Sequence, residues 1–221
     1  MIRAEHKKVL WDDGARKALI QEVLQKGFIR LEHFFDDASE PRFLSLREVF
    51  GPLAKNIKNQ QLGDTFANEV WKSDEIFEMC QLIHKTRCEL RGTPYTPLVR
   101  EKQSVGIAYK DAATVAKNQE TEFHYDAAYI NIVIPVQLPP QGEGDGNLIA
   151  FPNLRAKYPR IISAPISMVL RKIPFTRKLY GYTSVDYYVG ALHLFFGDVS
   201  LHGVPPIQKG ERMIMTINSH W

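Results

Sequence analysis

Apolar residues in the first part of the chain recur at the spacing of an α-helix. One predicted helix covers 12–27, begins at aspartates and ends at a glycine. A second candidate covers 42–57 and is interrupted near Gly51. The third covers 73–92, and its apolar stripe consists of Ile76, Met79, Cys80, Ile83, Arg87 and Leu90. A helical region over residues 1–96 is therefore expected.

After Pro97, apolar and polar residues alternate, which indicates β-strands. The candidate strands are 104–109, 121–124, 128–138, 147–151, 187–196, 199–202 and 212–218. The glycine-rich stretch 141–146 predicts a turn between two of them. Helices first and strands second are typical of an α+β domain, with helices packed on an antiparallel sheet or barrel. We expect one continuous domain, in which the helical region packs on a barrel over 97–221.

The composition is that of a globular protein with a packed interior. Of 221 residues, 44% are hydrophobic and 11% aromatic, which excludes a disordered or collagen-like chain. The formal net charge of +3 is too close to neutral for a dedicated nucleic-acid-binding protein. Cys80 and Cys88 lie too far apart on one predicted helix for a disulfide, which fits a reducing compartment. The charged start and the lack of a long apolar run predict a cytoplasmic protein.

Three potential metal ligands lie in the strand region. His124 and Asp126 are two residues apart, so on a strand both side chains point to the same face. His202 follows 76 residues after Asp126. Two imidazoles and one carboxylate leave three positions open on an octahedral ion, which suits Fe(II) better than a closed zinc site. Alternating polar residues also produce His-x-Asp by accident, so the pattern needs support from elsewhere in the chain.

Arg212 provides that support. It lies ten residues after His202 and opens the very apolar stretch 213–217, where a strand reaches into a core. The ordinary interpretation of an arginine on a strand is a solvated side chain. A guanidinium in a core, however, binds a carboxylate with two parallel hydrogen bonds and stays charged at physiological pH.

His124-Tyr125-Asp126, His202 and Arg212 resemble, in order and spacing, the His-x-Asp…His…Arg pattern of the Fe(II)/2-oxoglutarate-dependent oxygenases. The stretch 146–152, Gly-Asn-Leu-Ile-Ala-Phe-Pro, is similar to the Gly-x-Leu-x-x-x-Pro strand that many members carry between the two halves of the triad. The resemblance covers about 104–218. It implies a double-stranded β-helix, a jelly-roll or cupin-like core, with the N-terminal helices packed on it.

The resemblance also implies a role for each matching residue. His124, Asp126 and His202 would bind Fe(II), and Arg212 would pair with the distal carboxylate of 2-oxoglutarate. O₂ would then convert 2-oxoglutarate to succinate and CO₂ while a C–H bond of the substrate is oxidised. Related halogenases carry Gly or Ala in place of the aspartate, so Asp126 indicates a hydroxylase. Desaturation and epimerisation use the same iron site and stay open as outcomes.

The chain departs from the family's pattern beside the arginine. Many small-molecule members have Arg-x-Ser, whereas Ile214 stands at the serine position here. The second hydrogen bond to 2-oxoglutarate must come from elsewhere, and Tyr109, Asn131 and Thr216 are the candidates. Their ordinary interpretations are a rim aromatic, a polar barrel residue and a strand threonine. The family's nucleic-acid demethylases carry Arg-x-Asn-x-Thr-x-Arg, of which two of four positions are missing, so no nucleic-acid partner is expected.

Residues 152–185 contain no Asp or Glu but seven cations: Arg155, Lys157, Arg160, Arg171, Lys172, Arg177 and Lys178. The rest of the chain holds 21 of the 28 Lys and Arg against 25 Asp and Glu, so the near-neutral total conceals one basic segment. Such a segment beside the barrel attracts an anionic substrate, or an anionic membrane surface that its interleaved apolar residues would contact. The alternative is a lid with a solvated basic face and an apolar underside.

Within the family, this combination looks most like the hydroxylases of Kdo, the acidic sugar joined to lipid A in bacterial lipopolysaccharide. An anionic small molecule or a lipid-linked sugar is then the expected substrate. The basic segment would contact the inner face of the cytoplasmic membrane peripherally. One alternative is the same enzyme class acting on a soluble amino acid or secondary metabolite. The other is a non-catalytic jelly-roll binding module with an accidental triad.

Overall fold

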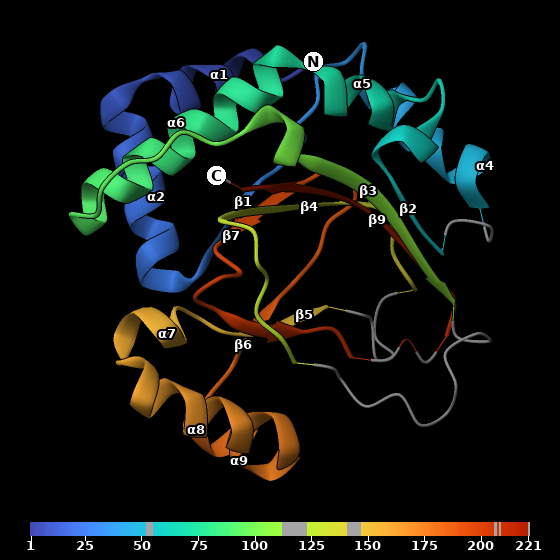
Figure 1. Cartoon of the computed structure of the whole chain (residues 1–221). Coiled ribbons are helices and arrows are strands. Elements are labelled where there is room, and N and C mark those ends of the chain that lie inside the picture. The colour runs from blue at the N-terminus through green and yellow to red at the C-terminus, as the bar shows by residue number, and fades with distance from the viewer. Residues whose placement is uncertain (52–54, 112–122, 141–146, 206, 208, 221) are drawn as a thin grey trace.

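The computed structural model describes residues 1–51, 55–111, 123–140, 147–205, 207 and 209–220. The glycine-rich stretch 141–146 and the first two residues of the predicted strand 121–124 lie outside the described residues. Two antiparallel sheets face each other, and the N-terminal helices cover the outer side of the larger sheet (Figure 1). The fold is therefore α+β, and the helices that cover the larger sheet come from the first half of the chain.

The larger sheet has six strands in the order β1-β7-β4-β9-β3-β2, and the smaller has three in the order β6-β5-β8. Their bounds are β1 (Phe28–Leu31), β2 (Lys55–Lys58), β3 (Ser104–Asp111), β4 (Ile130–Gln137), β5 (Leu148–Phe151), β6 (Thr183–Val185), β7 (Leu192–Phe195), β8 (Leu201–Gly203) and β9 (Glu211–Ser219). All neighbouring strands are antiparallel. An isolated bridge from His124 to His202 continues the smaller sheet beyond β8. The predicted jelly-roll core is confirmed.

Helices of the N-terminal region share one apolar core with the larger sheet, from Leu10, Ile20 and Ile83 to Val105 and Ile217. Their bounds are α1 (Ala4–Trp11), α2 (Asp13–Lys26), α3 (Glu40–Leu44), α4 (Leu46–Phe50), α5 (Phe66–Lys72) and α6 (Asp74–Arg91), with the 3-10 turns η2 (Asn59–Leu62) and η3 (Arg100–Lys102). Packing against the sheet stabilises these helices far more than local propensity does. The domain boundary at residue 96 stays a prediction.

Two of the predicted helices are confirmed together with the signals at their ends. The Asp12 carboxylate accepts a hydrogen bond from a backbone N–H in the first turn of α2 at 2.7 Å, and Gly27 ends the helix at φ 93°. The Ser73 hydroxyl caps α6 in the same way at 3.3 Å, and Gly92 ends that helix at φ 61°. Polar caps satisfy free N–H groups, and glycine adopts the left-handed conformation at little cost.

The second predicted helix is wrong in its last part. The short helices α3 and α4 stop at Gly51, whose φ is 39°. Residues 55–58 do not continue the helix but pair with β3 as strand β2 at the edge of the larger sheet. Residues 55–58 form a strand because they can pair with the open edge of β3. This pairing is a tertiary contact, so the periodicity of the local sequence does not reveal it.

The predicted strand 187–196 is shorter in the structure, because Gly190 turns the chain at φ 74° and only β7 follows. Neither β6, before this turn, nor β1, which pairs with β7, was predicted. The basic segment also contains helices that the sequence did not predict. They are α7 (Leu154–Lys157), α8 (Arg160–Lys172) and α9 (Pro174–Tyr180), which lie outside the smaller sheet (Figure 1).

Strand β9 separates two apolar environments. Met213, Met215 and Ile217 pack toward the helices. Ile214 belongs instead to a cluster between the two sheets, which we call the interior cluster and which also contains Val133, Leu148, Val185, Tyr187 and Phe195. Because side chains alternate along a strand, Arg212 points to the same side as Ile214. The jelly-roll interior therefore receives a guanidinium that is only 3% exposed.

Candidate metal centre

The three predicted metal ligands lie together at the edge of the smaller sheet. Nε2 of His202 is 3.2 Å from Oδ2 of Asp126, and Nε2 of His124 is 3.5 Å from Oδ1 of the same carboxylate. One ligand atom from each residue lies within 4.8 Å of the other two. The backbones of the histidines pair directly, since the N–H of each donates to the C=O of the other, at 2.8 and 3.0 Å. Backbone pairing thus sets the spacing of the two rings.

The His202 ring is held in one orientation. Its Nδ1 donates a hydrogen bond to the carbonyl oxygen of Ser200 at 3.0 Å, which fixes the ring with Nε2 toward Asp126. The edge-to-face ring of Phe195 is 4.9 Å away. The His202 side chain is 6% exposed and that of His124 is 52% exposed. The centre is therefore closed on the His202 side and open on the His124 side.

Asp126 is an ionised carboxylate with a fixed orientation. Burial by itself raises the pKa of Asp126, but hydrogen bonds and charge from His124 and His202 outweigh burial and hold the pKa well below its usual range. The side-chain amide of Asn131 donates to Oδ2 of Asp126 at 2.7 Å and to the side-chain oxygen of Asn218 at 3.0 Å. Asn131, predicted as a candidate for 2-oxoglutarate, thus lies against a metal ligand. Its role toward 2-oxoglutarate stays a prediction.

Gly197 approaches the Asp126 carboxylate more closely than any other residue type allows. A Cβ at this position would lie 2.4 Å from Oδ2 of Asp126 and 2.7 Å from the side-chain oxygen of Asn131. The Gly197 N–H donates to that Asn131 oxygen at 2.9 Å, and the Gly197 C=O accepts from the Asp126 N–H at 3.0 Å. No pattern in the sequence marked this glycine beyond its position shortly before His202. Its backbone holds both the aspartate and the asparagine that orients it.

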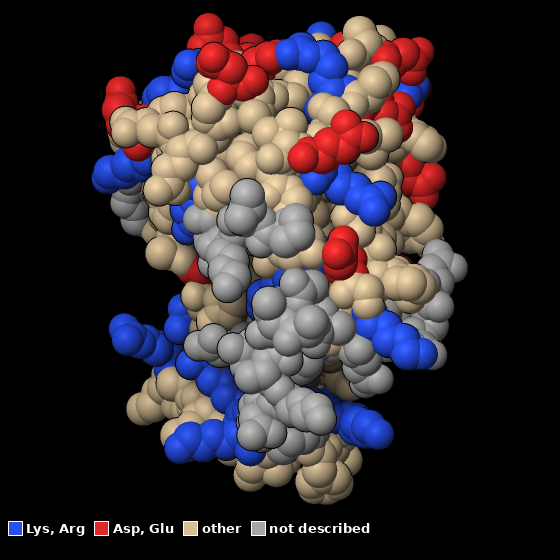
Figure 2. All heavy atoms as spheres, turned by 90° about the vertical axis from the view of Figure 1, so that its right-hand side faces the viewer, with Lys and Arg blue, Asp and Glu red and all other residues tan. Residues whose placement is uncertain are grey.

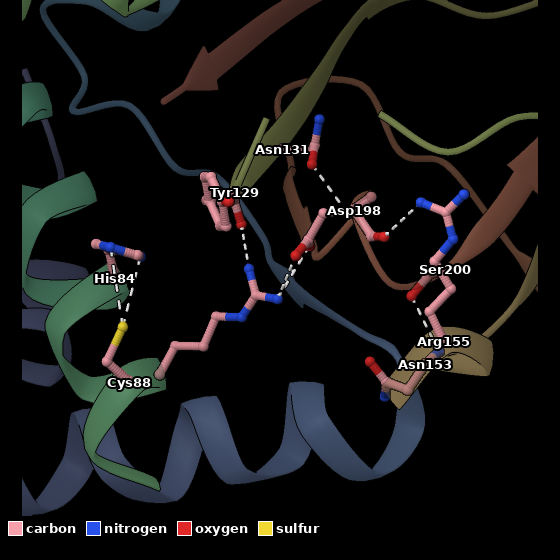
Figure 3. Close-up of polar contacts among 10 residues, drawn as sticks. His84, Cys88, Tyr129, Asn131, Asn153, Arg155, Asp198 and Ser200 are labelled. Atoms are coloured by element: carbon pink, nitrogen blue, oxygen red, sulfur yellow. Dashed lines mark hydrogen bonds and ion pairs between the residues drawn. The ribbon is translucent and has the colours of Figure 1, made fainter. Parts of the chain in front are cut away.

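The loop that leads into His202 is tied to the helices and to the basic segment (Figure 3). Asp198 accepts two hydrogen bonds from Arg87 of α6, at 2.9 and 2.7 Å, and Arg87 also donates to the Tyr129 carbonyl at 2.7 Å. Ser200 accepts from the backbone N–H of Asn153 at 3.0 Å. The only sequence signal for Arg87 was its position within the apolar stripe of the third predicted helix. A buried arginine there fixes the loop beside the centre.

Tyr187 was not predicted and lies in the interior cluster with its phenol close to charged groups. Burial raises the pKa of Tyr187 to about 12, while the charge of Arg212 lowers it and that of Asp126 raises it. Both residues are therefore within electrostatic reach of the phenol, which stays protonated at neutral pH. Burial lowers the pKa of Arg212 and the nearby Tyr187 raises it. The interior thus holds a guanidinium and a neutral hydroxyl, a pair that suits a carboxylate.

The other two candidates for 2-oxoglutarate lie on opposite faces of the larger sheet. Thr216 is on the Arg212 face of β9, and its hydroxyl is 3.5 Å from the Gly106 carbonyl of β3. Tyr109 is cross-strand partner to Met213 and packs with it in the core toward the helices. The structure thus brings Thr216 to the interior and does not bring Tyr109 there. Their roles toward 2-oxoglutarate stay predictions.

His193 of β7 also points into the jelly-roll interior, where its ring is 4.8 Å from that of Tyr187. Its Nε2 accepts a hydrogen bond from the Tyr188 N–H at 3.4 Å. Burial, with a smaller contribution from the charge of Arg30, lowers the pKa of His193 to about 4. His193 is therefore a neutral interior residue, outside the group that could hold a metal.

A cavity of about 310 Å³ lies between α8 and Tyr125, and none of the three candidate ligands lines it. We call it the cationic cavity, because four of its lining residues are Arg155, Arg160, Arg171 and Lys172. Arg155 stacks 3.6 Å from the ring centroid of Tyr125, the residue between the two ligands His124 and Asp126. The Tyr125 hydroxyl lies 2.7 Å from that of Ser167. No described carboxylate lies within 4.0 Å of these four cations, so the cavity suits an oxyanion.

A helix-backed jelly roll with two histidines and one aspartate at the edge of its smaller sheet defines the class of fold and site. No protein-family model matches the chain, and no curated protein matches its sequence. Solved structures of 2-oxoglutarate-dependent oxygenases match its fold. A prolyl 4-hydroxylase from Phytophthora capsici shows 15% identity and a TM-score of 0.60 over 99% of this chain, which spans 66% of that longer chain.

Two smaller proteins are matched over more of their length. The non-heme alpha-ketoglutarate-dependent epimerase SnoN from nogalamycin biosynthesis shows 12% identity and a TM-score of 0.60, over 94% of this chain and 84% of its own. HygX from Streptomyces hygroscopicus, solved with nickel and 2-oxoglutarate bound, shows 14% identity and a TM-score of 0.51, over 91% of this chain and 85% of its own. The likeness is one of fold and extends over nearly the whole chain.

We expect Gly197→Ala to weaken metal binding by at least about tenfold, since the added methyl group displaces Asp126 and Asn131. The measurement is anaerobic titration of the purified chain with Fe(II). Gly14→Ala is the matched control, because its Cβ meets only an Asp12 oxygen at 3.5 Å, an ordinary contact. Fe(II) affinity unchanged in Gly197→Ala would contradict the assignment.

We expect His193 to make the metal-free protein sensitive to acid. Its pKa is about 4 in the fold against the usual 6.5, so between these values only the unfolded chain takes up the proton. The free energy of unfolding should therefore fall by about 2 kcal/mol between pH 7 and pH 5 on account of this residue. The measurement is urea unfolding of both proteins at pH 7 and at pH 5. The free energy of unfolding of His193→Gln should lack this part of the decrease.

The exposed His33 provides a control, and His33→Asn suits its φ of 48° because asparagine tolerates that conformation. This control should keep the acid sensitivity of the unaltered chain. Equal pH dependence in His193→Gln and the unaltered chain would show that His193 is already protonated in the fold.

Proposed function

We propose that the protein is an Fe(II)/2-oxoglutarate-dependent hydroxylase. The observation that carries the proposal is the grouping of His124, Asp126 and His202, whose ligand atoms all lie within 4.8 Å of one another. Two imidazoles and a carboxylate leave three positions open on an octahedral ion, enough for a chelating keto acid and for O₂. The donor set and its fixed protonation fit Fe(II).

The residues of the interior would hold 2-oxoglutarate. Arg212 would bind the distal carboxylate through parallel hydrogen bonds, and the neutral phenol of Tyr187 would donate a second hydrogen bond. Tyr187 would then replace the serine that Ile214 displaces from the family's Arg-x-Ser pattern. When bound, iron with 2-oxoglutarate and O₂ would supply the oxidising power for a C–H bond, with succinate and CO₂ as products.

The remaining residues would orient and shield this chemistry. Asn131 would act as a positioning residue, because it directs one Asp126 oxygen and is itself held by Gly197. Phe195 and the rest of the interior cluster would exclude water from the side opposite His124. The exposed His124 side is then the side from which a substrate approaches.

The substrate that the charges favour is an anion. The cationic cavity lies beside Tyr125 and has no described carboxylate partner, so a phosphate or a carboxylate of the substrate would be seated there. A Kdo sugar on lipid A offers both groups, and we propose it as the particular substrate. The two buried free cysteines, Cys80 and Cys88, favour the reducing cytoplasm as the location.

A soluble amino acid or secondary metabolite is the alternative substrate class. HygX was solved with hygromycin B bound, so a comparable fold accepts an antibiotic. An epimerase among the fold's relatives keeps outcomes other than hydroxylation open. A non-catalytic binding module is the other alternative, and in it Arg212 would hold a carboxylate ligand without turnover.

We expect the purified chain with Fe(II) and O₂ to convert 2-oxoglutarate to succinate, even without substrate. His202→Ala removes a ligand and Arg212→Met removes the carboxylate partner, so both should reduce succinate formation to background. Succinate is measured by chromatography, with circular dichroism to verify folding. Turnover that survives in both folded variants would exclude this use of the site.

We expect Tyr187→Phe to raise KM for 2-oxoglutarate about ten- to hundredfold, because it removes one hydrogen bond to a charged group. Fe(II) affinity should stay unchanged. Tyr109→Phe is the matched control, since Tyr109 packs toward the helices and should leave KM unaltered. The opposite result in the two variants would assign the second hydrogen bond to Tyr109 instead.

We expect cells that contain the protein to accumulate a metabolite or lipid with one additional oxygen atom. Mass spectrometry of total lipids and of soluble metabolites, from cells with and without the gene, identifies the fraction. A modified lipopolysaccharide sugar would support the Kdo proposal. A modified soluble compound alone would favour the alternative class, and the His202→Ala chain serves as the negative control.

A further inference from the structure

The surface of α8 and α9 exposes an unusual number of large apolar side chains. Ile161, Leu179 and Phe175 are 83%, 78% and 70% exposed, the highest values for large apolar residues in the described part of the chain. Met168 and Val169 on α8, and Ile173 between the two helices, are also exposed. We call these six residues the α8–α9 apolar surface. Single exposed apolar residues are ordinary, but a contiguous group marks a contact site.

The helix α8 has three different sides. Ser163, Ser167 and Leu170 are buried and face the smaller sheet. Arg160 and Arg171 lie on a second side and line the cationic cavity. The third side carries the exposed Ile161 and Val169, and Met168 lies at its border with the cationic cavity. A helix with one packed, one basic and one exposed apolar side is typical of an element that lies in a membrane interface.

An apolar groove of about 440 Å³ runs between α8 and α9. It is lined mainly by Pro165, Ile166, Val169, Leu170 and Leu179. No described charged side chain lines it. The groove lies on α8 on the side away from the cationic cavity, so one helix separates an apolar site from a cationic one. An anionic lipid likewise combines an apolar acyl chain, which suits the groove, with a charged headgroup, which suits the cationic cavity.

The charge around this surface is of one sign. All seven Lys and Arg of 152–185 lie on or beside α7, α8 and α9, with no Asp or Glu in the segment. In Figure 2, Lys and Arg surround the end of the molecule that carries these helices, and the Asp and Glu in view lie on the opposite part. Each such cation near an anionic bilayer contributes about 1 kcal/mol of attraction.

We propose that the α8–α9 apolar surface docks the protein onto an anionic lipid bilayer. The negative bilayer surface complements the basic segment, and the apolar side chains enter the boundary between headgroups and acyl chains. A second copy of the chain is disfavoured as the occupant, because two surfaces that each carry seven cations repel one another. No helix of the described residues is long and apolar enough to cross the membrane, so the contact is peripheral.

Docking in this way would present lipid headgroups to the cationic cavity. That cavity is lined by Tyr125 but by none of the three candidate ligands, so a headgroup would bind there outside the smaller sheet. The proposal does not rest on the hydroxylase activity, because lipid binding requires neither iron nor turnover. Failure of one proposal therefore leaves the other in place.

The test is co-sedimentation of the full chain with vesicles of phosphatidylcholine alone or mixed with phosphatidylglycerol. We expect binding to the anionic vesicles only, and weaker binding as salt is raised. Phe175→Ser combined with Leu179→Ser should lower the partition coefficient at least about tenfold. Lys178→Gln should lower it about fivefold, which corresponds to the loss of one surface cation.

The control variant is Val49→Ser combined with Arg47→Gln on α4, where an exposed apolar residue and an exposed cation lie far along the chain from the basic segment. It should bind as the unaltered chain does, and thermal unfolding verifies that every variant folds. Equal binding to neutral and anionic vesicles, no binding to either, or unchanged binding of Phe175→Ser/Leu179→Ser would each overturn the proposal. So would a solution dimer that this double variant dissociates, since the surface would then join two copies.

Discussion

The backbone of Gly197 packs against the Asp126 carboxylate without room for a side chain between them. This contact brings the loop before β8 onto the segment that carries the first two ligands. Two residues before Asp126, the backbone of His124 pairs with that of His202 and fixes the separation of the imidazoles. The geometry of the three ligands is therefore set mainly by the backbone. A rigid site of this kind binds a metal without losing much side-chain entropy.

The grouping of His124, Asp126 and His202 could be predicted, because residue type and spacing single these residues out directly. The orientation of Tyr109 could not be predicted, because the register of β3 against β9 decides which side of the sheet it faces. That register places Tyr109 toward the helices, whereas Tyr187 belongs to a segment that the sequence assigned to one long strand. Gly197 had no distinguishing signal, since its importance lies in contacts with residues far away in sequence.

The basic segment was recognised from its charge, but its helices were not. Pro159 and Pro174 interrupt the periodicity at either end of α8, and Pro165 lies inside that helix. Proline inside a helix removes one backbone hydrogen bond, which makes a helical assignment from sequence unfavourable. Packing of Ser167 and Leu170 against the body of the protein maintains the helix. Only the folded helix shows that Arg160 and Arg171 line one cavity whereas Ile166 and Val169 line an apolar groove.

The ion pair between Arg87 and Asp198 connects the helical layer to the centre. Arg87 is 4% exposed and Asp198 is 19% exposed, so the pair is largely removed from water. Breaking such a pair leaves a charge buried without compensation, so α6 and the His202 loop unfold together more readily than separately. An ion that binds only the folded centre then raises the free energy of unfolding of the helical layer by mass action. Binding of an ion at the centre and unfolding of α6 are therefore thermodynamically coupled.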